Sequence, residues 1–143
     1  MKLSPAEARE RFGAARVARL ATVSGTHQPH LVPFTFALVR AAGAGDAGDL
    51  IVHAVDHKPK VSTDLKRLRN IAENGQVAAL ADGYSDDWNQ LWWARADGVA
   101  EIRTTLGADL HEMLAGRYPQ YRDRRPDGPF VVIRVGRWSG WSA

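Results

Sequence analysis

The stretch V-H-A-V-D-H-K-P-K-V-S-T-D-L-K-R-L-R-N-I-A-E-N-G, residues Val52–Gly75, determines how the rest of the chain can be arranged. Its first residues continue an apolar, β-branched run that begins at Leu50 and predicts a strand ending at Val55. Leucine and isoleucine spaced three residues apart in its second half predict an amphipathic helix, which Ser62 or Thr63 would cap. A strand therefore leads through a short basic loop directly into the N-terminus of a helix.

The loop between this strand and this helix carries His57, Lys58 and Lys60, and Pro59 restricts its backbone. A helix N-terminus attracts anions, because its first N–H groups have no partner within the helix and its dipole is positive there. Two lysines beside that end predict a phosphate site. A solvated basic loop on an ordinary strand–helix connection explains the same residues, so both interpretations stay open from this stretch alone.

Length and composition predict a single domain over residues 1–143. The chain has no cysteine, which excludes disulfide scaffolds, zinc–thiolate sites and thiol nucleophiles. The formal net charge is +3, but the arginines are scattered among acids and no nucleic-acid motif is present, so we expect no nucleic-acid partner. The sequence shows neither a signal peptide nor an apolar run that could span a bilayer, which predicts a cytoplasmic protein without a membrane partner.

The N-terminal third predicts a helix followed by a β-hairpin. Ser4–Glu7 has the pattern of a capping box, and we expect its helix to end at Gly13. Residues Arg16–Val23 and His30–Val39 predict two strands joined by a turn. Pro33 lies inside the second strand, and because proline cannot donate a ladder hydrogen bond, it predicts an edge or a bulge.

The remaining pattern completes a mainly β fold. About six strands with short helices between them predict an antiparallel barrel with helices packed outside. The further elements expected are a strand over Gln76–Ala81, a long strand over Gln90–Arg103 interrupted at Asp97–Gly98, a helix over Leu106–Leu114, a connection over Tyr118–Gly128, a last strand over Pro129–Val135 and a tail to Ala143.

The sequence contains no recognisable catalytic group. It has no nucleophile motif, and the acids within Asp82–Asp87 lie in turn-like sequence, where turn formation and capping explain them better than acid–base catalysis does. The nearest approach to a metal-binding set is His53, Asp56 and His57. These residues span the end of a strand, where side chains diverge, so we expect no metal site and no catalytic residue.

The tryptophans suggest a cleft or a subunit interface. Trp92 and Trp93 are adjacent on a strand and must therefore point to opposite faces, so they cannot both enter one core. Trp138 and Trp141 lie in the predicted tail. Apolar surface of this size is typical of a ligand cleft or an interface between subunits, although simple packing of the tail on the barrel remains an alternative.

These parts occur together in a known family. The ordered motifs resemble those of the split β-barrel flavin/deazaflavin oxidoreductases, the group similar to pyridoxamine-phosphate oxidase, and within it the coenzyme F420-dependent branch of actinobacteria. The matching motifs are A-T-V-S-G-T-H-Q-P-H-L-V-P-F (21–34), D-H-K-P-K (56–60), L-K-R-L-R-N-I-A-E-N (65–74), Y-S-D-D-W (84–88), L-W-W-A-R-A-D-G-V-A (91–100) and R-W-S-G-W (137–141). One departure is Gly75-Gln76, which stands where the family commonly has Pro-Arg.

The resemblance implies a split β-barrel of six to seven mostly antiparallel strands with short flanking helices. It also implies a homodimer that binds F420, with FMN as the alternative, in a groove at the subunit interface. Hydride would pass between the deazaflavin and an unsaturated or conjugated organic substrate; a non-catalytic F420 carrier is the other alternative. The residues that the resemblance places near the cofactor are Val32, Pro33, Phe34, Thr35, His57, Lys58, Lys60, Arg67, Trp92, Trp138 and Trp141.

Overall fold

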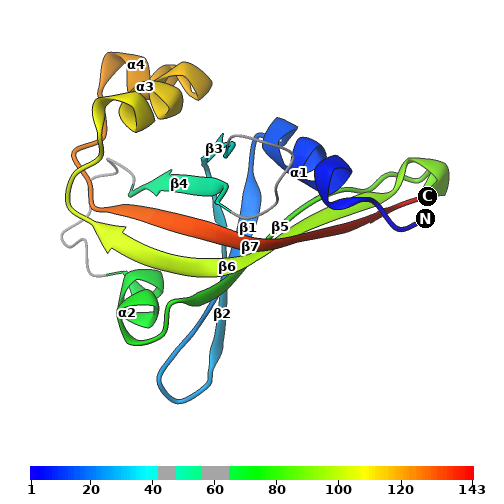
Figure 1. Cartoon of the computed structure of the whole chain (residues 1–143), viewed down its shortest axis with the longest axis horizontal. Helices are drawn as coiled ribbons and strands as arrows, with labels where there is room; N and C mark the ends of the chain where they lie inside the picture. Colours follow the sequence, from blue (N-terminus) through cyan, green and yellow to red (C-terminus); the bar gives the residue numbers. More distant parts are fainter. Residues whose placement is uncertain (42–47, 56–64) are drawn as a thin grey trace.

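The computed structural model describes residues 1–41, 48–55 and 65–143, and its main feature is one antiparallel sheet of seven strands (Figure 1). The spatial order of the strands is β2-β1-β5-β6-β7-β4-β3. This arrangement confirms the predicted mainly β, barrel-like fold with short helices around it. The strands are β1 (Ala18–Val23), β2 (Pro29–Phe34), β3 (Ala37–Val39), β4 (Leu50–Ala54), β5 (Gln76–Gly83), β6 (Trp92–Arg103) and β7 (Phe130–Ser142).

The single strand predicted over His30–Val39 was wrong, because this segment forms two strands that lie at opposite edges of the sheet. β2 ends at Phe34 and β3 begins at Ala37, three peptide units or at most roughly 11 Å further along the chain. In a flat sheet the six intervening spacings would separate these strands by roughly 29 Å. The sheet must therefore curl until its edges meet, which produces a split barrel. Pro33 lies on edge strand β2, as predicted.

The inside of the barrel holds the main hydrophobic core. Alternate residues of each strand point inward, for example Leu20 of β1 and Ile133 of β7, which are 0% and 1% exposed. Helix α1 (Pro5–Ala14) packs against this core through Phe12, whose ring centroid lies 4.8 Å from that of Phe36. The capping box at its start is present as predicted, and the helix continues one residue beyond Gly13.

The two longest strands, β6 and β7, are paired along their whole length. Their register shifts between Asp97 and Gly98, which confirms the predicted interruption. A Cβ atom at Gly98 would lie 2.3 Å from the carbonyl oxygen of Arg134, so only glycine allows this close approach. The prediction of a separate tail after Val135 was wrong, since β7 continues to Ser142 and pairs with the start of β6.

Two helices follow β6 and cover the outer face of β3 and β4, where they form a second, smaller core (Figure 1). They are α3 (Ala108–Arg117) and α4 (Pro119–Asp123). Most of the predicted Tyr118–Gly128 connection is irregular, but it contains α4. The second core joins residues such as Val52 of β4 and Leu114 of α3, both 0% exposed.

Helix α2 (Lys66–Glu73) packs on β1 and β6. Leu68 and Ile71 are buried, as the helical spacing predicted. Asn70, a polar residue of this helix, is also buried: it is 1% exposed, and its Nδ2 donates to the hydroxyl of Thr22 at 2.9 Å. The N-cap position of α2 is Leu65, so the prediction that Ser62 or Thr63 caps this helix was wrong; both residues, and most of the Ala41–Gly48 loop, lie outside the described residues. No helix in the described ranges is long and apolar enough to cross a membrane.

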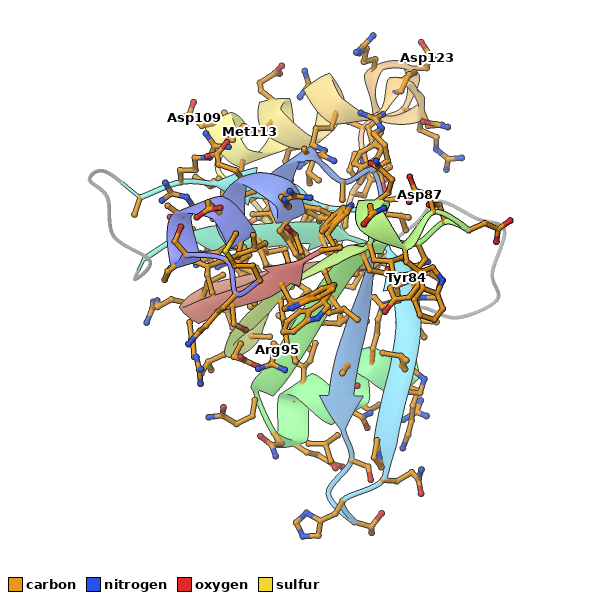
Figure 2. The ribbon with its side chains drawn as sticks, turned by 90° about the vertical axis from the view of Figure 1, so that its right-hand side faces the viewer. Tyr84, Asp87, Arg95, Asp109, Met113 and Asp123 are labelled. Atoms are coloured by element: carbon orange, nitrogen blue, oxygen red, sulfur yellow. The ribbon has the colours of Figure 1, made fainter. Side chains whose placement is uncertain are left out.

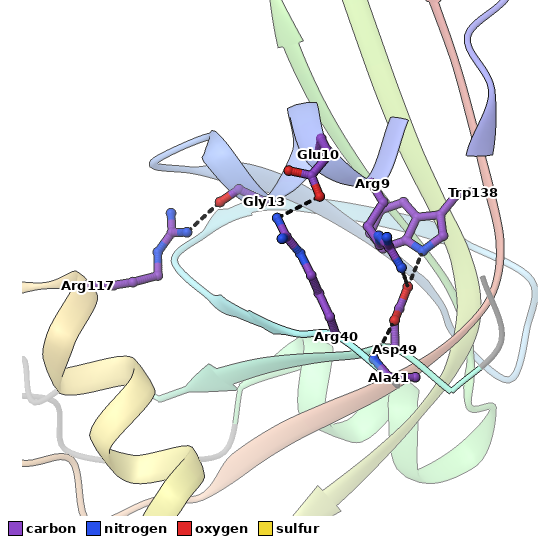
Figure 3. Close-up of polar contacts among 8 residues, drawn as sticks. All are labelled: Arg9, Glu10, Gly13, Arg40, Ala41, Asp49, Arg117 and Trp138. Atoms are coloured by element: carbon purple, nitrogen blue, oxygen red, sulfur yellow. Dashed lines mark hydrogen bonds and ion pairs between the residues drawn. The ribbon is translucent and has the colours of Figure 1, made fainter. Parts of the chain in front are cut away.

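A buried carboxylate joins α1, the start of β4 and β7 (Figure 3). Asp49 is 0% exposed and accepts hydrogen bonds from the indole N–H of Trp138 at 2.8 Å and from the backbone N–H of Ala41 at 2.7 Å. The guanidinium of Arg9 lies 3.6 Å from the same carboxylate. A buried charge with three polar neighbours is compensated, whereas removing one partner from such a set is costly.

We expect Asp49→Asn to lower the free energy of unfolding by about 2–4 kcal/mol, because the amide cannot accept at both positions and removes the buried negative charge beside Arg9. Urea titration followed by circular dichroism measures this change. The control is Glu10→Gln, which removes the exposed ion pair with Arg40 and should cost less than about 1 kcal/mol. Equal losses in the two variants would contradict the structural role of Asp49.

Candidate functional site

The centre of the candidate site is the crossover from β2 to β3, which consists of Thr35 and Phe36. Its backbone belongs to neither strand, so its polar groups are available for other contacts. The carbonyl oxygen of Thr35 lies 2.9 Å from Nδ1 of His53 on β4. A carbonyl can only accept, so Nδ1 of His53 carries the proton in this contact. The His53 ring also meets the Phe34 ring edge to face, with centroids 5.4 Å apart. These contacts hold the crossover against the end of β4. In the chain, β4 is followed by the basic segment, the loop that carries His57, Lys58 and Lys60.

A cavity of about 160 Å³ opens beside Thr35. Its described lining residues are Thr35 from the crossover and Tyr118, Gln120 and Tyr121 from the α3–α4 junction. The hydroxyl oxygens of Thr35 and Tyr121 are 3.4 Å apart. The cavity therefore presents hydroxyl and amide groups together with aromatic edges, which suits a small conjugated ligand that carries polar substituents.

The predicted phosphate site lies only partly within the described residues. His57, Lys58 and Lys60 lie outside them, so their role stays a prediction. Arg67 is half-buried in the first turn of α2, which directly follows the basic segment. The N-cap residue, Leu65, makes no side-chain hydrogen bond to the first turn of the helix. A helix start with an arginine and no side-chain cap fits an anionic group.

A second and larger hollow, about 390 Å³, lies on the outer face of the sheet. Its described lining residues are Leu80, Asp82, Tyr84, Trp93 and Arg95, from β5, β6 and the turn between them, and Figure 2 shows Tyr84 and Arg95 on this part of the molecule. The guanidinium carbon of Arg95 lies 5.7 Å from the centroid of the Trp93 ring. The two aromatic side chains, Tyr84 and Trp93, make this hollow suitable for a flat ring or for another protein surface.

The tryptophans divide between the two faces of the sheet. Trp92 packs against the main core and Trp93 lines the outer hollow, as the strand alternation predicted. Trp138 is 3% exposed, and its indole N–H is bound by Asp49, so this residue has a packing role within the chain. Trp141 is 39% exposed and is the register partner of Trp93. The structure therefore does not bring the predicted cofactor-contacting tryptophans together within one chain.

The strand expected to contact the cofactor ring also divides between two faces. The side chains of Val32 and Phe34 pack into the core, whereas Pro33 is exposed on the outer face. Thr35 faces the small cavity. Side chains that point to different faces cannot all meet one ring, so a ring placed here would contact mainly the backbone of this segment.

The acidic residues have structural roles. Asp82 forms an ion pair with Arg19 at 3.2 Å, and Asp87 accepts a hydrogen bond from the backbone N–H of Asn89 at the start of a short 3₁₀ turn (Trp88–Gln90). The described residues contain no group of three or more His, Cys, Asp or Glu side chains that could hold a metal ion; Asp56 and His57 are not among them.

Sequence reasoning missed the contribution of the α3–α4 junction. Tyr118 and Tyr121 line the small cavity and contact the crossover, but they follow Phe36 and Thr35 by 82 and 86 positions in the chain. No local pattern marks such a pairing. The available signal was the pair of tyrosines that flanks Pro119, and its local sequence says nothing of the segment that these side chains meet.

The described residues fit a ring cofactor that carries a phosphate. The crossover offers a backbone wall, the cavity beside it accommodates a small acceptor molecule, and the start of α2 offers a positive end with Arg67. The crossover and the cavity share Thr35, and the His53–Thr35 contact joins the crossover to β4, the strand that precedes α2 in the chain. Such an arrangement suits the binding and orientation of a ligand, and its described residues include no paired acid and base of the kind that hydrolytic chemistry needs.

Comparison with known proteins gives a family and a fold. The family model described as “Pyridoxamine 5'-phosphate oxidase” matches residues 4–142. No curated protein matches the sequence.

Three solved structures are similar over nearly the whole chain. A FAD-binding protein from Mesorhizobium loti is 20% identical, with 98% of this chain and 93% of that chain covered and a TM-score of 0.73. A conserved hypothetical protein from Mycobacterium tuberculosis is 20% identical (98% and 85% covered, TM-score 0.71), and the FAD-binding protein from Mycobacterium smegmatis is 17% identical (99% and 97%, TM-score 0.62). At these identities the likeness shows the shared fold.

Proposed function

The chain belongs to the pyridoxamine 5'-phosphate oxidase family, and from this membership we propose that it is an oxidoreductase that uses coenzyme F420. When bound, the reduced deazaflavin supplies a hydride to an unsaturated or conjugated organic substrate. The observation that carries the proposal is the family match over residues 4–142, which includes the crossover, the basic segment and the α3–α4 junction. The protein itself binds and orients the two reactants.

The crossover supports the position of the cofactor ring. Its backbone is held by His53 on one side and borders the Thr35 cavity on the other. The backbone of Val32–Thr35 would hold the ring, and the cavity beside Thr35 would take the acceptor. The hydroxyls of Thr35 and Tyr121 would then orient the polar substituents of the acceptor.

The basic segment supports the position of the phosphate-bearing tail. Lys58 and Lys60 precede α2, and Arg67 lies in its first turn. Coenzyme F420 carries a phosphate and a polyglutamate tail, which suits a chain with a formal net charge of +3. Attraction between such charges strengthens binding and depends on salt concentration.

A flavin is the alternative cofactor. Two of the similar structures belong to proteins named as FAD-binding, and FMN would use the same phosphate site. The resemblance of the ordered motifs to the deazaflavin branch favours F420, and the polyanionic tail of F420 suits the positive net charge of the chain. A non-catalytic F420 carrier would show the same binding without turnover.

The experiment that tests the cofactor is titration of the purified apoprotein with F420 and with FMN, followed by cofactor fluorescence. We expect a colourless protein from a host that lacks F420, and tighter binding of F420 than of FMN. A yellow preparation with stoichiometric FMN would show that the cofactor is FMN and not F420. Binding of F420 without substrate reduction across a panel of conjugated acceptors would favour the carrier.

Replacement of Lys60 tests the phosphate site. We expect Lys60→Ala to weaken F420 binding by about ten- to a hundredfold, which corresponds to roughly 1–3 kcal/mol for one charge-assisted contact. The salt dependence of binding should flatten, and the melting temperature should change little. Lys66→Ala, at the exposed first residue of α2, removes a further charge at the same end of the helix and should weaken binding less than Lys60→Ala does. Unchanged affinity in the Lys58/Lys60 double alanine variant would remove the phosphate assignment.

We also propose that two copies associate through the outer face of the sheet. Along the row of neighbouring positions Leu31, Ala21 and Ala78 this face is apolar, and Leu31 is 66% exposed. Hollows of about 310 and 390 Å³ lie on the same face. Exposed apolar surface of this kind is typical of an interface between subunits.

Light scattering at micromolar concentration tests this association. We expect a particle of twice the 15.7 kDa chain mass, and we expect Leu31→Lys to reduce it to a single chain, because the interface would have to bury a charge. Met113→Lys, at a 39% exposed position on α3, should leave the mass unchanged. A wild-type mass of 15.7 kDa would contradict the proposal.

A further inference from the structure

We infer that Tyr118 is a positioning residue whose hydroxyl fixes the backbone of the Thr35–Phe36 crossover, and with it the wall of the cofactor site. The inference rests on the proposed function, since it concerns the site described there. Its evidence lies in the hydrogen bonds of one side chain at the α3–α4 junction. Tyr118 is 8% exposed; it lines the small cavity, and its hydroxyl contacts the backbone of the crossover.

The crossover lacks the support that neighbouring strands normally provide. Phe34 is paired with Ala18 of β1, and Ala37 is paired with Val52 of β4, but Thr35 and Phe36 between them belong to neither ladder. Phe36 is 0% exposed. Buried backbone N–H and C=O groups need partners, so those of Phe36 must be satisfied by something other than a strand.

The hydroxyl of Tyr118 satisfies them. It accepts a hydrogen bond from the backbone N–H of Phe36 at 3.0 Å. Its own proton can be donated to the carbonyl oxygen of Phe36 or to that of Arg16, each 3.0 Å away. One hydroxyl therefore joins the crossover to the segment between α1 and β1, and no other donor or acceptor on this side chain can take its place.

The ring that carries this hydroxyl is itself held in place. The guanidinium carbons of Arg16 and Arg117 lie 5.3 and 5.5 Å from its centroid. Arg117 also donates to the carbonyl oxygens of Gly13, at 2.6 Å, and Ala15, and Figure 3 shows the contact with Gly13. Arg16 in turn donates to the carbonyl oxygen of Arg117 at 2.7 Å. Both arginines contact the ring and are themselves bound to backbone carbonyl oxygens, so they hold the ring, and with it the hydroxyl, in place.

The loss of this hydroxyl would act on the site through the backbone. Tyr118→Phe keeps the ring but leaves the buried N–H of Phe36 without its acceptor. The crossover must then shift or admit a water molecule, and Thr35, which lines the cavity and receives the His53 contact, moves with it. Small displacements of binding groups reduce affinity more than they reduce stability, because binding depends on geometry.

The turn between β1 and β2 offers a matched control. Ser24 is 7% exposed, and its hydroxyl accepts a hydrogen bond from the backbone N–H of Gln28 at 3.0 Å. Ser24→Ala therefore removes the same kind of contact, a buried hydroxyl that accepts from a backbone N–H. The turn lies at the opposite end of β2 from the crossover (Figure 1), so this loss leaves the site intact.

The experiment compares Tyr118→Phe and Ser24→Ala in the purified protein, using F420 and FMN as probes. We expect both variants to lower the melting temperature by a few degrees. Only Tyr118→Phe should weaken binding of the preferred cofactor, by about tenfold, as the loss of one well-placed contact would. Wild-type affinity in Tyr118→Phe, or an equal loss in Ser24→Ala, would overturn the inference.

Hydrogen exchange of the apoprotein separates this inference from the proposed function. We expect the backbone N–H of Phe36 to exchange faster in Tyr118→Phe and at the wild-type rate in Ser24→Ala. Unchanged exchange in Tyr118→Phe would overturn the role of the hydroxyl. If the wild-type protein bound neither F420 nor FMN, the proposed function would be contradicted. The exchange rates of the Phe36 N–H would still test the role of Tyr118 at the crossover.

Discussion

The structure depends on the short link between β2 and β3. Because only Thr35 and Phe36 separate two strands that lie at opposite edges of the sheet, the sheet cannot be flat. Curling brings the inward residues of the strands into one core and leaves the outer face for other contacts. The same link is backbone without ladder partners, so side chains from elsewhere must satisfy it. The constraint that closes the barrel therefore also creates the candidate site.

Polar side chains secure the closed barrel where backbone pairing ends. Asp49 joins the indole of Trp138 to the backbone of Ala41, and Arg117 binds the carbonyl oxygens at the end of α1. Each of these groups contacts segments far from it in the sequence. They differ from the exposed ion pairs, such as that of Arg40 and Glu10, whose charges remain in contact with water and contribute little.

The candidate site offers positioning and electrostatics, which agrees with membership of the pyridoxamine 5'-phosphate oxidase family. Its parts come from the crossover, the end of β4, the start of α2 and the α3–α4 junction. In such a site the cofactor supplies the reactive chemistry, so the protein needs no paired acid and base. This accounts for acids such as Asp82 and Asp87, which serve an ion pair and a turn.

The sequence by itself determined the features that depend on neighbouring residues. The capping box at Ser4, the edge position of Pro33, the opposite faces of Trp92 and Trp93 and the interruption at Gly98 were all predicted, since local spacing and backbone chemistry govern them. Only the tertiary structure decided where β2 ends, that β7 includes Trp138 and Trp141, that Asn70 is buried, and that Tyr118 meets Phe36. These depend on which distant segments become neighbours when the sheet curls, and a residue's own sequence context carries no record of a partner 82 positions away.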